Sequence, residues 1–536
     1  MGYYNLISLM SPKSSLDPDA QAFITAATIT DTTQKAAIDK LVTDLKGYGI
    51  WTKMKALYPF VGGTASQHKF NLKNPLDTDA AFRLVFSGGW THSNMGALPN
   101  GTNSFANTFF RPNNWTNINN AHMSYYSRTN VNGAQVEIGM FANDENGNSN
   151  NSLAVRYNDS FQSLLNLFSN VGWLLVGNTN SSGQFMANRY VVNSLNSWKN
   201  GVKQGEIAST PSINTGNIYN YTLGAWNYNG TAEAFSTKQA AFASFGDGLT
   251  DTEAANYYTA VQTFQTSLNR QVGVPIVADA DAQAFLNAAV IEDVTQANAV
   301  NTLVTSLKGY GIWSKMKALY PFVGGTATTH KFNLKNPLDT NAAFRLVFSG
   351  GWTHSITGAL PNGTNSWADT FFFNGGANNS WTSKDNAHLS YYSRTDNNFQ
   401  QIEIGLYQGA TNNNNGFATR YLSNQSFYTL SIAGNSGTLN TVNTDGRGFY
   451  SANRNAVNTL NGWKNGVKQG QVASTSFTGN GALSYPIACV NEDGAKVAYS
   501  SKECAFASFG DGLTDTEAAN YYTAVQTFQT TLSRNV

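Results

Sequence analysis

Apolar side chains at helical spacing predict two short helices near the start of the chain. One apolar face is formed at positions i, i+3, i+4 and i+7 by Ile38, Leu41, Val42 and Leu45. Asp31 stands before this helix as an N-cap, and Gly47 is expected to close it. An earlier helix is predicted after Asp17, because Pro18 is well tolerated at the first helical position.

Short apolar runs separated by Gly- and Asn-containing turns follow, and they predict strands at residues 69–72, 81–86, 122–128, 135–141 and 241–245. Strands of this length between such turns are typical of an antiparallel β-sandwich. A final helix is predicted where Thr250 and Glu253 form a capping box.

The same pattern occurs twice. Residues 46–51 return as 308–313, and residues 241–266 return letter for letter as 505–530. This period is far longer than that of stacked repeats, so it indicates a duplicated domain. The predicted organisation is a leader at 1–15, a module at 16–270, a linker at 271–277 and a second module at 278–536.

The ending at residues 242–253, Phe-Ala-Ser-Phe-Gly-Asp-Gly-Leu-Thr-Asp-Thr-Glu, resembles the last strand, turn and helix of concanavalin A-like, laminin-G-like jelly rolls. With residues 19–23, 48–51 and 86–92, it is similar to a domain of tailed-phage virion proteins, notably in phages of Bacteroidota. The resemblance implies a mainly β chain of two tandem jelly-roll domains with flanking helices. It also implies a structural or adhesive role in a head fibre, capsid decoration or tail fibre, and no catalytic residues.

Composition narrows the possible partners. Charged residues are 12% and aromatic residues 13% of the chain, and the net charge is +1 without a basic cluster. Binding to nucleic acid by phosphate neutralisation is therefore not expected.

No apolar run is long enough to span a bilayer and no secretory signal is visible, so membrane insertion is not expected. An Asn- and Tyr-rich, weakly charged surface nevertheless suits an extracellular or particle-borne protein. A protein made in the host cytoplasm and carried on the virion surface accounts for both this composition and the lack of a signal. Its expected partners are other virion proteins and host surface polysaccharide, and a homo-oligomer stays open.

The acidic residues argue against an enzyme. A glycan-degrading sandwich needs paired carboxylates on one sheet face, and Glu137 and Glu403 are lone acids in their predicted strands. The expected function is therefore non-enzymatic, with a glycan depolymerase as the less favoured alternative. The six histidines recur as the pairs His68/His330, His92/His354 and His122/His388. Their spacing is irregular and no Cys or close carboxylate accompanies them, which favours hydrogen-bonded strand residues over metal ligands. No cofactor is predicted, although calcium bound by loop oxygens of Asp247, Asp511 or the Asn-rich loops stays open.

Trp115 and Trp381 are the predicted glycan-binding residues, because both lie in Asn-rich loops. Sugar recognition requires an exposed aromatic face with amide partners nearby. The alternative is that these rings cap the edge of the sandwich.

Cys489 and Cys504 replace Ala225 and Ala240 of the first copy, so they are expected on adjacent strands, as a disulfide or as two free thiols.

The two copies differ most in four polar stretches of the first module: residues 111–120, 141–153, 160–183 and 207–234. Divergent loops on a rigid scaffold are typical of recognition, and relaxed drift on solvent faces is the alternative. The leader has no second copy, and its apolar residues are candidates for docking onto another virion protein or for packing on the chain's own modules. These residues are Tyr3, Tyr4, Leu6, Ile7, Leu9 and Met10.

Overall fold

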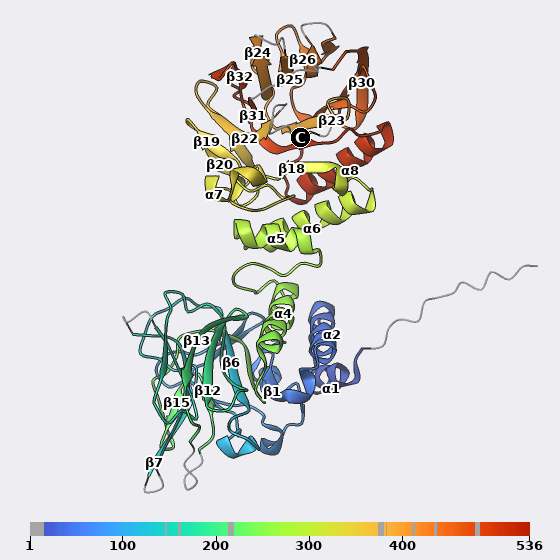
Figure 1. Ribbon diagram of the computed structural model, residues 1–536. Helices are drawn as coiled ribbons and strands as arrows, with labels where there is room; N and C mark the ends of the chain where they lie inside the picture. The colour runs from blue at the N-terminus through green and yellow to red at the C-terminus, as the bar shows by residue number, and fades with distance from the viewer. Residues whose placement is uncertain are drawn as a thin grey trace, which may run out of the picture. The chain divides into compact units, whose positions relative to one another are not determined.

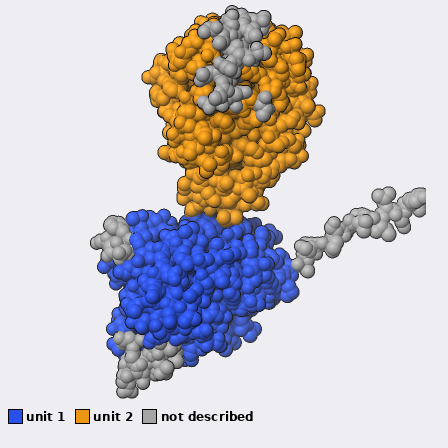
Figure 2. Space-filling model, viewed as in Figure 1, with its two compact units in different colours: residues 1–272 blue, residues 273–536 orange. Residues whose placement is uncertain are grey.

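The computed structural model describes residues 16–144, 147–158, 162–212, 219–373, 380–381, 383–409, 413–433, 437–476 and 483–536. The chain divides into two compact units, residues 1–272 and 273–536 (Figure 2), and each is described by itself. The leader residues predicted to dock, 3–10, lie outside the described residues. No helix in the described ranges is long and apolar enough to cross a membrane.

The long helices of unit 1 are α1 (Pro18–Ala26), α2 (Thr32–Gly47) and α4 (Asp251–Ser267). Each begins at its predicted N-cap, since side-chain oxygens of Asp17, Asp31 and Thr250 accept backbone N–H bonds of the first turn. The predicted end of α2 is wrong, because the helix includes Gly47 and the left-handed residue that follows is Gly49, with φ of 73°. Single helical turns form α3 (Ala65–His68), Trp51–Lys53, Asp79–Ala81 and Pro112–Asn114.

Two sheets make up the sandwich of unit 1. The inner sheet contains β1 (Met54–Tyr58), β3 (Thr91–Ser93), β4 (Gly96–Leu98), β6 (Ala121–Ser127), β11 (Gly183–Arg189), β12 (Ser194–Lys199), β13 (Val202–Ala208) and β17 (Ala240–Gly246). The outer sheet contains β2 (Val85–Ser87), β5 (Phe105–Asn107), β7 (Ile138–Asp144), β8 (Gly147–Tyr157), β9 (Gln162–Leu167), β10 (Leu174–Gly177), β14 (Thr222–Leu223), β15 (Trp226–Tyr228) and β16 (Thr231–Glu233). Pairing is antiparallel except between β15 and β7.

The inner sheet is covered on both faces. One core joins it to α1, α2 and α4, which lie together on one side of the strands in Figure 1. A second core fills the space between the inner and outer sheets. The outer sheet therefore has one face in the core and one face that no helix among the described residues of unit 1 covers.

Unit 2 repeats this arrangement with helices α5 (Ala280–Ala289), α6 (Val294–Gly309), α7 (Ala327–His330) and α8 (Asp515–Thr531), and single turns at Trp313–Lys315 and Asn341–Ala343. Its inner sheet contains β18 (Met316–Tyr320), β20 (Thr353–Ser355), β21 (Gly358–Leu360), β23 (Ala387–Ser393), β28 (Gly448–Arg454), β29 (Thr459–Lys464), β30 (Val467–Ala473) and β34 (Cys504–Gly510). Its outer sheet contains β19 (Val347–Ser349), β22 (Trp367–Phe373), β24 (Ile404–Gln408), β25 (Asn413–Tyr421), β26 (Gln425–Ala433), β27 (Leu439–Val442), β31 (Ser484–Ile487), β32 (Val490–Glu492) and β33 (Ala495–Val497). The predicted fold class, a mainly β chain of two sandwiches with flanking helices, is confirmed.

Two predicted strands are wrong. Residues 69–72 form no strand, because the Asn71 side chain takes the place of a ladder: it accepts from Leu57 N at 2.9 Å and donates to Ala81 O at 3.0 Å. In residues 81–86, Phe82 has a left-handed φ of 60°, and the strand begins only at Val85. Apolar residues in both segments pack inward from irregular backbone, which periodicity alone does not reveal.

In each unit a buried arginine just after the last helix, α4 or α8, donates hydrogen bonds to backbone carbonyls of distant loops. Arg270 donates to Pro59 O, Phe60 O and Asn94 O at 2.6, 2.7 and 3.0 Å, and is 1% exposed. Burial lowers its pKa to about 9, so it remains charged at neutral pH. In unit 2, Arg534 makes the matching bonds, including those to Pro321 O and Phe322 O.

Candidate functional site

The predicted glycan-binding tryptophans lie in the core. Trp115 is 4% and Trp381 2% exposed. Their Nε1 atoms donate to Gly246 O at 2.6 Å and to Gly510 O at 2.9 Å. Neither indole has a face that a sugar could reach, so their predicted role as stacking surfaces is wrong. The loops around them are polar, but the rings themselves pack between the two sheets, where burial of a large aromatic side chain is most favourable.

Four other aromatic rings gather on the uncovered face of the unit 1 outer sheet. Ile138, Met140 and Ala142 of β7 point into the core, so the alternate residue Phe141 points away from it. Its ring stacks on Tyr228 with a centroid distance of 4.7 Å and an interplanar angle of 7°. Trp226 lies 5.2 Å from Tyr228 and 6.3 Å from Trp173. We call these four half-buried residues, Phe141, Trp173, Trp226 and Tyr228, the aromatic platform.

A glycine lets the central indole of the platform lie against the sheet. A Cβ atom at Gly139 would come within 2.5 Å of Trp226 Cδ1, so a larger residue there would displace the ring. Polar groups border the platform: Asn150 pairs with Phe141 across β7 and β8, and its Oδ1 accepts from Ser152 Oγ at 2.7 Å. The platform therefore combines aromatic faces with an amide, the pair of chemistries that sugar binding requires.

The platform is specific to unit 1. Its residues fall in three of the four stretches that differ between the copies. At the matching positions unit 2 has Tyr407, Thr438, Val490 and Glu492, so only one aromatic ring remains. Sequence analysis missed these residues because they are dispersed along the chain, but the divergence of the copies marks the stretches that contain them.

A pocket of about 560 Å³ opens near the loop that carries Trp115. We call it the Arg111 pocket, and it is lined by Asp79, Ala80, Phe82, Phe109, Arg111, Asn113, Asn114 and Asn220. Arg111 is exposed and its Nε donates to Asn220 Oδ1 at 2.6 Å. The Asn114 side chain is also held in place, because its Oδ1 accepts a hydrogen bond from the Arg111 backbone N–H at 2.7 Å.

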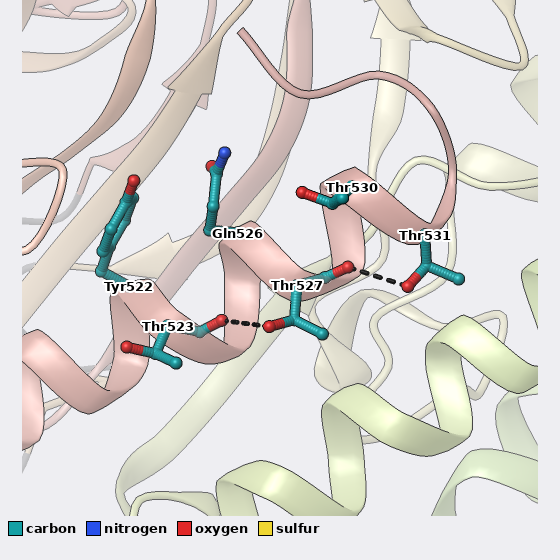
Figure 3. A pocket seen from close by; sticks show the side chains of 6 residues that line it. All are labelled: Tyr522, Thr523, Gln526, Thr527, Thr530 and Thr531. Atoms are coloured by element: carbon teal, nitrogen blue, oxygen red, sulfur yellow. Dashed lines mark hydrogen bonds between the residues drawn. The ribbon is translucent and has the colours of Figure 1, made fainter.

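A smaller hollow of about 320 Å³ runs along α8 of unit 2 (Figure 3). Thr527 Oγ1 donates to Thr523 O at 2.8 Å and Thr531 Oγ1 to Thr527 O at 2.9 Å, so these hydroxyls are engaged by the helix itself. None of the six residues that line the hollow is charged: Tyr522, Thr523, Gln526, Thr527, Thr530 and Thr531. It offers little to a polar ligand.

The lone acids are buried partners of lysines. Glu137 Oε1 lies 3.0 Å from Lys238 Nζ, and both side chains are fully buried. Ser236 Oγ and Val155 N also donate to the Glu137 carboxylate, at 2.9 and 2.7 Å. Glu403 and Lys502 repeat the pair at 2.8 Å in unit 2. These carboxylates are saturated by donors inside the protein, which suits a structural role and not general acid–base chemistry.

The histidines are likewise engaged within each unit. His68 Nδ1 and His92 Nδ1 lie 2.9 Å apart, and His330 and His354 repeat this distance. His122 Nδ1 lies 2.7 Å from Asp247 O. Within the described ranges, no group of three or more His, Cys, Asp or Glu residues stands close enough to hold a metal ion.

The two cysteines are free, and they lie on different sheets. Cys504 begins β34 of the inner sheet, whereas Cys489 follows β31 of the outer sheet, and both are fully buried. The expectation that they occupy adjacent strands is wrong. Burial raises the pKa of Cys489 to about 12, so this thiol is protonated and unreactive at neutral pH.

No protein-family model matches the chain, and no curated protein matches it. Among solved structures, the chain is similar to NanB sialidase from Streptococcus pneumoniae, with 16% identity over 27% of this chain and 24% of that chain and a TM-score of 0.22. It is also similar to the CBM40 of Ruminococcus gnavus IT-sialidase bound to α2,3-sialyllactose, with 15% identity over 25% and 79% and a TM-score of 0.21. A third match is mouse laminin α1 chain domains LG4-5, with 9% identity over 72% and 80% and a TM-score of 0.19. The chain thus spans about a quarter of the NanB sialidase, and these are distant likenesses between lectin-like β-sandwich domains.

Proposed function

We propose that the protein is a non-enzymatic component of a tailed-phage virion, displayed on the particle surface, whose first unit binds host surface glycan through the aromatic platform. The place on the particle is a capsid decoration, head fibre or tail fibre. The virion part of the proposal rests on the sequence resemblance. The glycan part rests on one observation: four aromatic rings gather on a sheet face that none of the described helices of the unit covers.

The platform suits the apolar face of a pyranose ring. A sugar ring carries C–H groups on its faces and hydroxyls at its edge, so it is recognised by an aromatic surface with polar groups beside it. Trp226 lies at the centre of the platform, in contact with Phe141, Tyr228 and Trp173. Because the rings support one another, little side-chain freedom is lost when a ligand binds.

Trp226→Ala is expected to weaken binding of host surface polysaccharide by about tenfold or more, because a central aromatic contact is lost. The measurement is titration of the purified full chain with polysaccharide fragments, by calorimetry. Trp226→Phe should retain most of the affinity, since a flat ring remains. The matched control is Val490→Ala in unit 2, which should bind as the unchanged chain does. Equal affinities for the Trp226→Ala variant and the unchanged chain, with unfolding temperatures also equal, would show that the platform is not the glycan site.

The virion part has a separate test. Antibodies against the purified chain, coupled to gold, are expected to label the outside of intact phage particles from a host that produces the protein. Label density along the head or the tail distinguishes decoration, head fibre and tail fibre. Particles that contain none of the chain by mass spectrometry would overturn this part while leaving the glycan part standing.

A further inference from the structure

We propose that the Arg111 pocket selects glycans that carry a carboxylate, so that unit 1 binds acidic sugars in preference to neutral ones. This inference rests on the proposed glycan-binding function. It adds a second contact site to the aromatic platform and names the chemical class of its ligand.

The pocket presents donors to a ligand. Arg111 uses its Nε for Asn220 Oδ1, and no described residue accepts a hydrogen bond from its two terminal nitrogens. The amide oxygens of Asn114 and Asn220 are occupied by Arg111, and no described residue accepts from their Nδ2 atoms. Guanidinium and amide donors without internal acceptors suit a ligand that only accepts, and an ionised carboxylate is such a ligand.

The charge of the pocket also favours an anion. Its one acid, Asp79, is already paired, because its Oδ1 accepts from Arg83 Nε at 2.9 Å. Arg111 has no ion pair with any described acid. The pocket therefore carries an uncompensated positive charge beside the ring of Phe109. A uronic or related acidic sugar can place its carboxylate on the Arg111 guanidinium and its C–H face on the Phe109 ring.

A hydrogen bond links the Arg111 pocket to the strand that carries two residues of the aromatic platform. Asn227, which stands between Trp226 and Tyr228 on β15, donates from Nδ2 to Asn220 O at 2.9 Å. One segment of chain thus carries a residue of the pocket and two residues of the platform, and this hydrogen bond joins its two parts.

Comparison of the units indicates which residue confers selectivity. Phe82 and Phe109 have counterparts with the same left-handed backbone in unit 2, namely Phe344 and Phe371. Arg111 has none, since Phe373 follows the matching Phe372. The aromatic walls belong to the shared fold, and the guanidinium is particular to unit 1.

The test uses the full chain and a panel of acidic oligosaccharides, each paired with its carboxyl-reduced form, which differs only in that charge. The unchanged chain should bind the acidic form about tenfold more tightly, with a preference that weakens as salt rises. Arg111→Gln should remove the preference, so that the acidic and the reduced forms bind with equal affinity. Asn113→Asp, which adds a carboxylate at an exposed rim position and so offsets the charge of Arg111, should weaken the preference. Arg447→Gln, at an exposed arginine of unit 2, is the control.

The outcomes separate this inference from the proposed function. Equal binding of acidic and reduced forms by the unchanged chain overturns the inference and leaves glycan binding intact. A preference that survives in Arg111→Gln places acid recognition elsewhere and also overturns it. Failure of every oligosaccharide to bind the unchanged chain overturns both proposals.

Discussion

Glu137→Ala is expected to lower the free energy of unfolding of unit 1 by about 3–5 kcal/mol, because it leaves a lysine ammonium buried without its counter-charge. Lys238 is fully buried, and among the described residues Gln135 Oε1, at 3.1 Å, would still accept a hydrogen bond from it. The substitution also strips the Ser236 hydroxyl and the Val155 N–H of their acceptor. Removing one member of a buried ion pair costs more than the pair itself contributes, since the surviving charge stays desolvated.

Urea unfolding followed by tryptophan fluorescence measures the effect. The double variant Glu137→Met with Lys238→Met should recover at least half of the loss, because no buried charge remains. Glu403→Ala should reproduce the loss in unit 2, where the pair is repeated. Glu206→Ala is the control: its contact with Lys203 is solvent-exposed, so a change below about 1 kcal/mol is expected. A loss of similar size in the single and double variants would contradict the ion-pair explanation.

Local signals in the sequence identified the helices well. The N-caps at Asp17, Asp31 and Thr250 depend only on neighbouring residues, so each start was predictable from a few letters. The internal repeat then predicted that the second half of the chain has the same fold as the first. Segments whose backbone is held by distant side chains were not predictable, as at Asn71, whose amide satisfies groups of residues 57 and 81.

Buried charge was the least predictable feature. A glutamate or lysine inside a strand looks like a solvent-facing residue, because charged side chains are seldom fully buried without a partner. Glu137 and Lys238 are 101 residues apart, and Arg270 binds carbonyls more than 170 residues away. The prediction for Trp115 was wrong in the opposite direction. Its polar loop suggested an exposed ring, but the indole lies in the core and its Nε1 donates to Gly246 O.

The candidate sites emerge from the differences between the copies. The stretches that diverge contain Phe141, Trp173, Trp226 and Tyr228, and also Arg111 and Asn220. These stretches are separated along the chain, but the outer sheet brings the four rings together on one face, and a hydrogen bond from Asn227 links β15 to Asn220 of the pocket. Phe141, Trp226 and Tyr228 contact one another and Trp173 contacts Trp226. Drift on a solvent face would not be expected to assemble such a cluster, so it supports the proposed role in recognition.

Acid is expected to destabilise both units, beginning at pH values where carboxylates are still ionised. Burial lowers the pKa of His68 to about 3 and that of His122 to about 4, and their counterparts His330 and His388 match them. The unfolded chain has histidine pKa values near 6.5 and so binds more protons between that pH and the folded pKa. Stability is therefore complete above about pH 6.5 and falls as the pH is lowered toward 3–4.

The geometry explains why these imidazoles stay neutral. His68 and His92 face each other through Nδ1 atoms 2.9 Å apart, so one proton satisfies the pair and a second would place two cations in contact. His122 is fixed on both sides, by Asp247 O at Nδ1 and Ser244 Oγ at Nε2, and a Cβ atom at Gly246 would come within 2.5 Å of its ring. No carboxylate accepts a hydrogen bond from either ring among the described residues, so protonation gains no counter-charge.

Between pH 7 and 5, each of His68 and His122 should therefore reduce the stability of unit 1 by about 2 kcal/mol. Urea unfolding at pH 7.5, 6 and 5 measures the slope. His122→Gln should be less stable at pH 7.5 but should show a shallower decline with pH, since one proton fewer is taken up on unfolding. His354→Gln in unit 2 should leave the slope of unit 1 unchanged. Equal free energies of unfolding at pH 7.5 and 5 in the unchanged chain would mean that these histidines are protonated in the folded state.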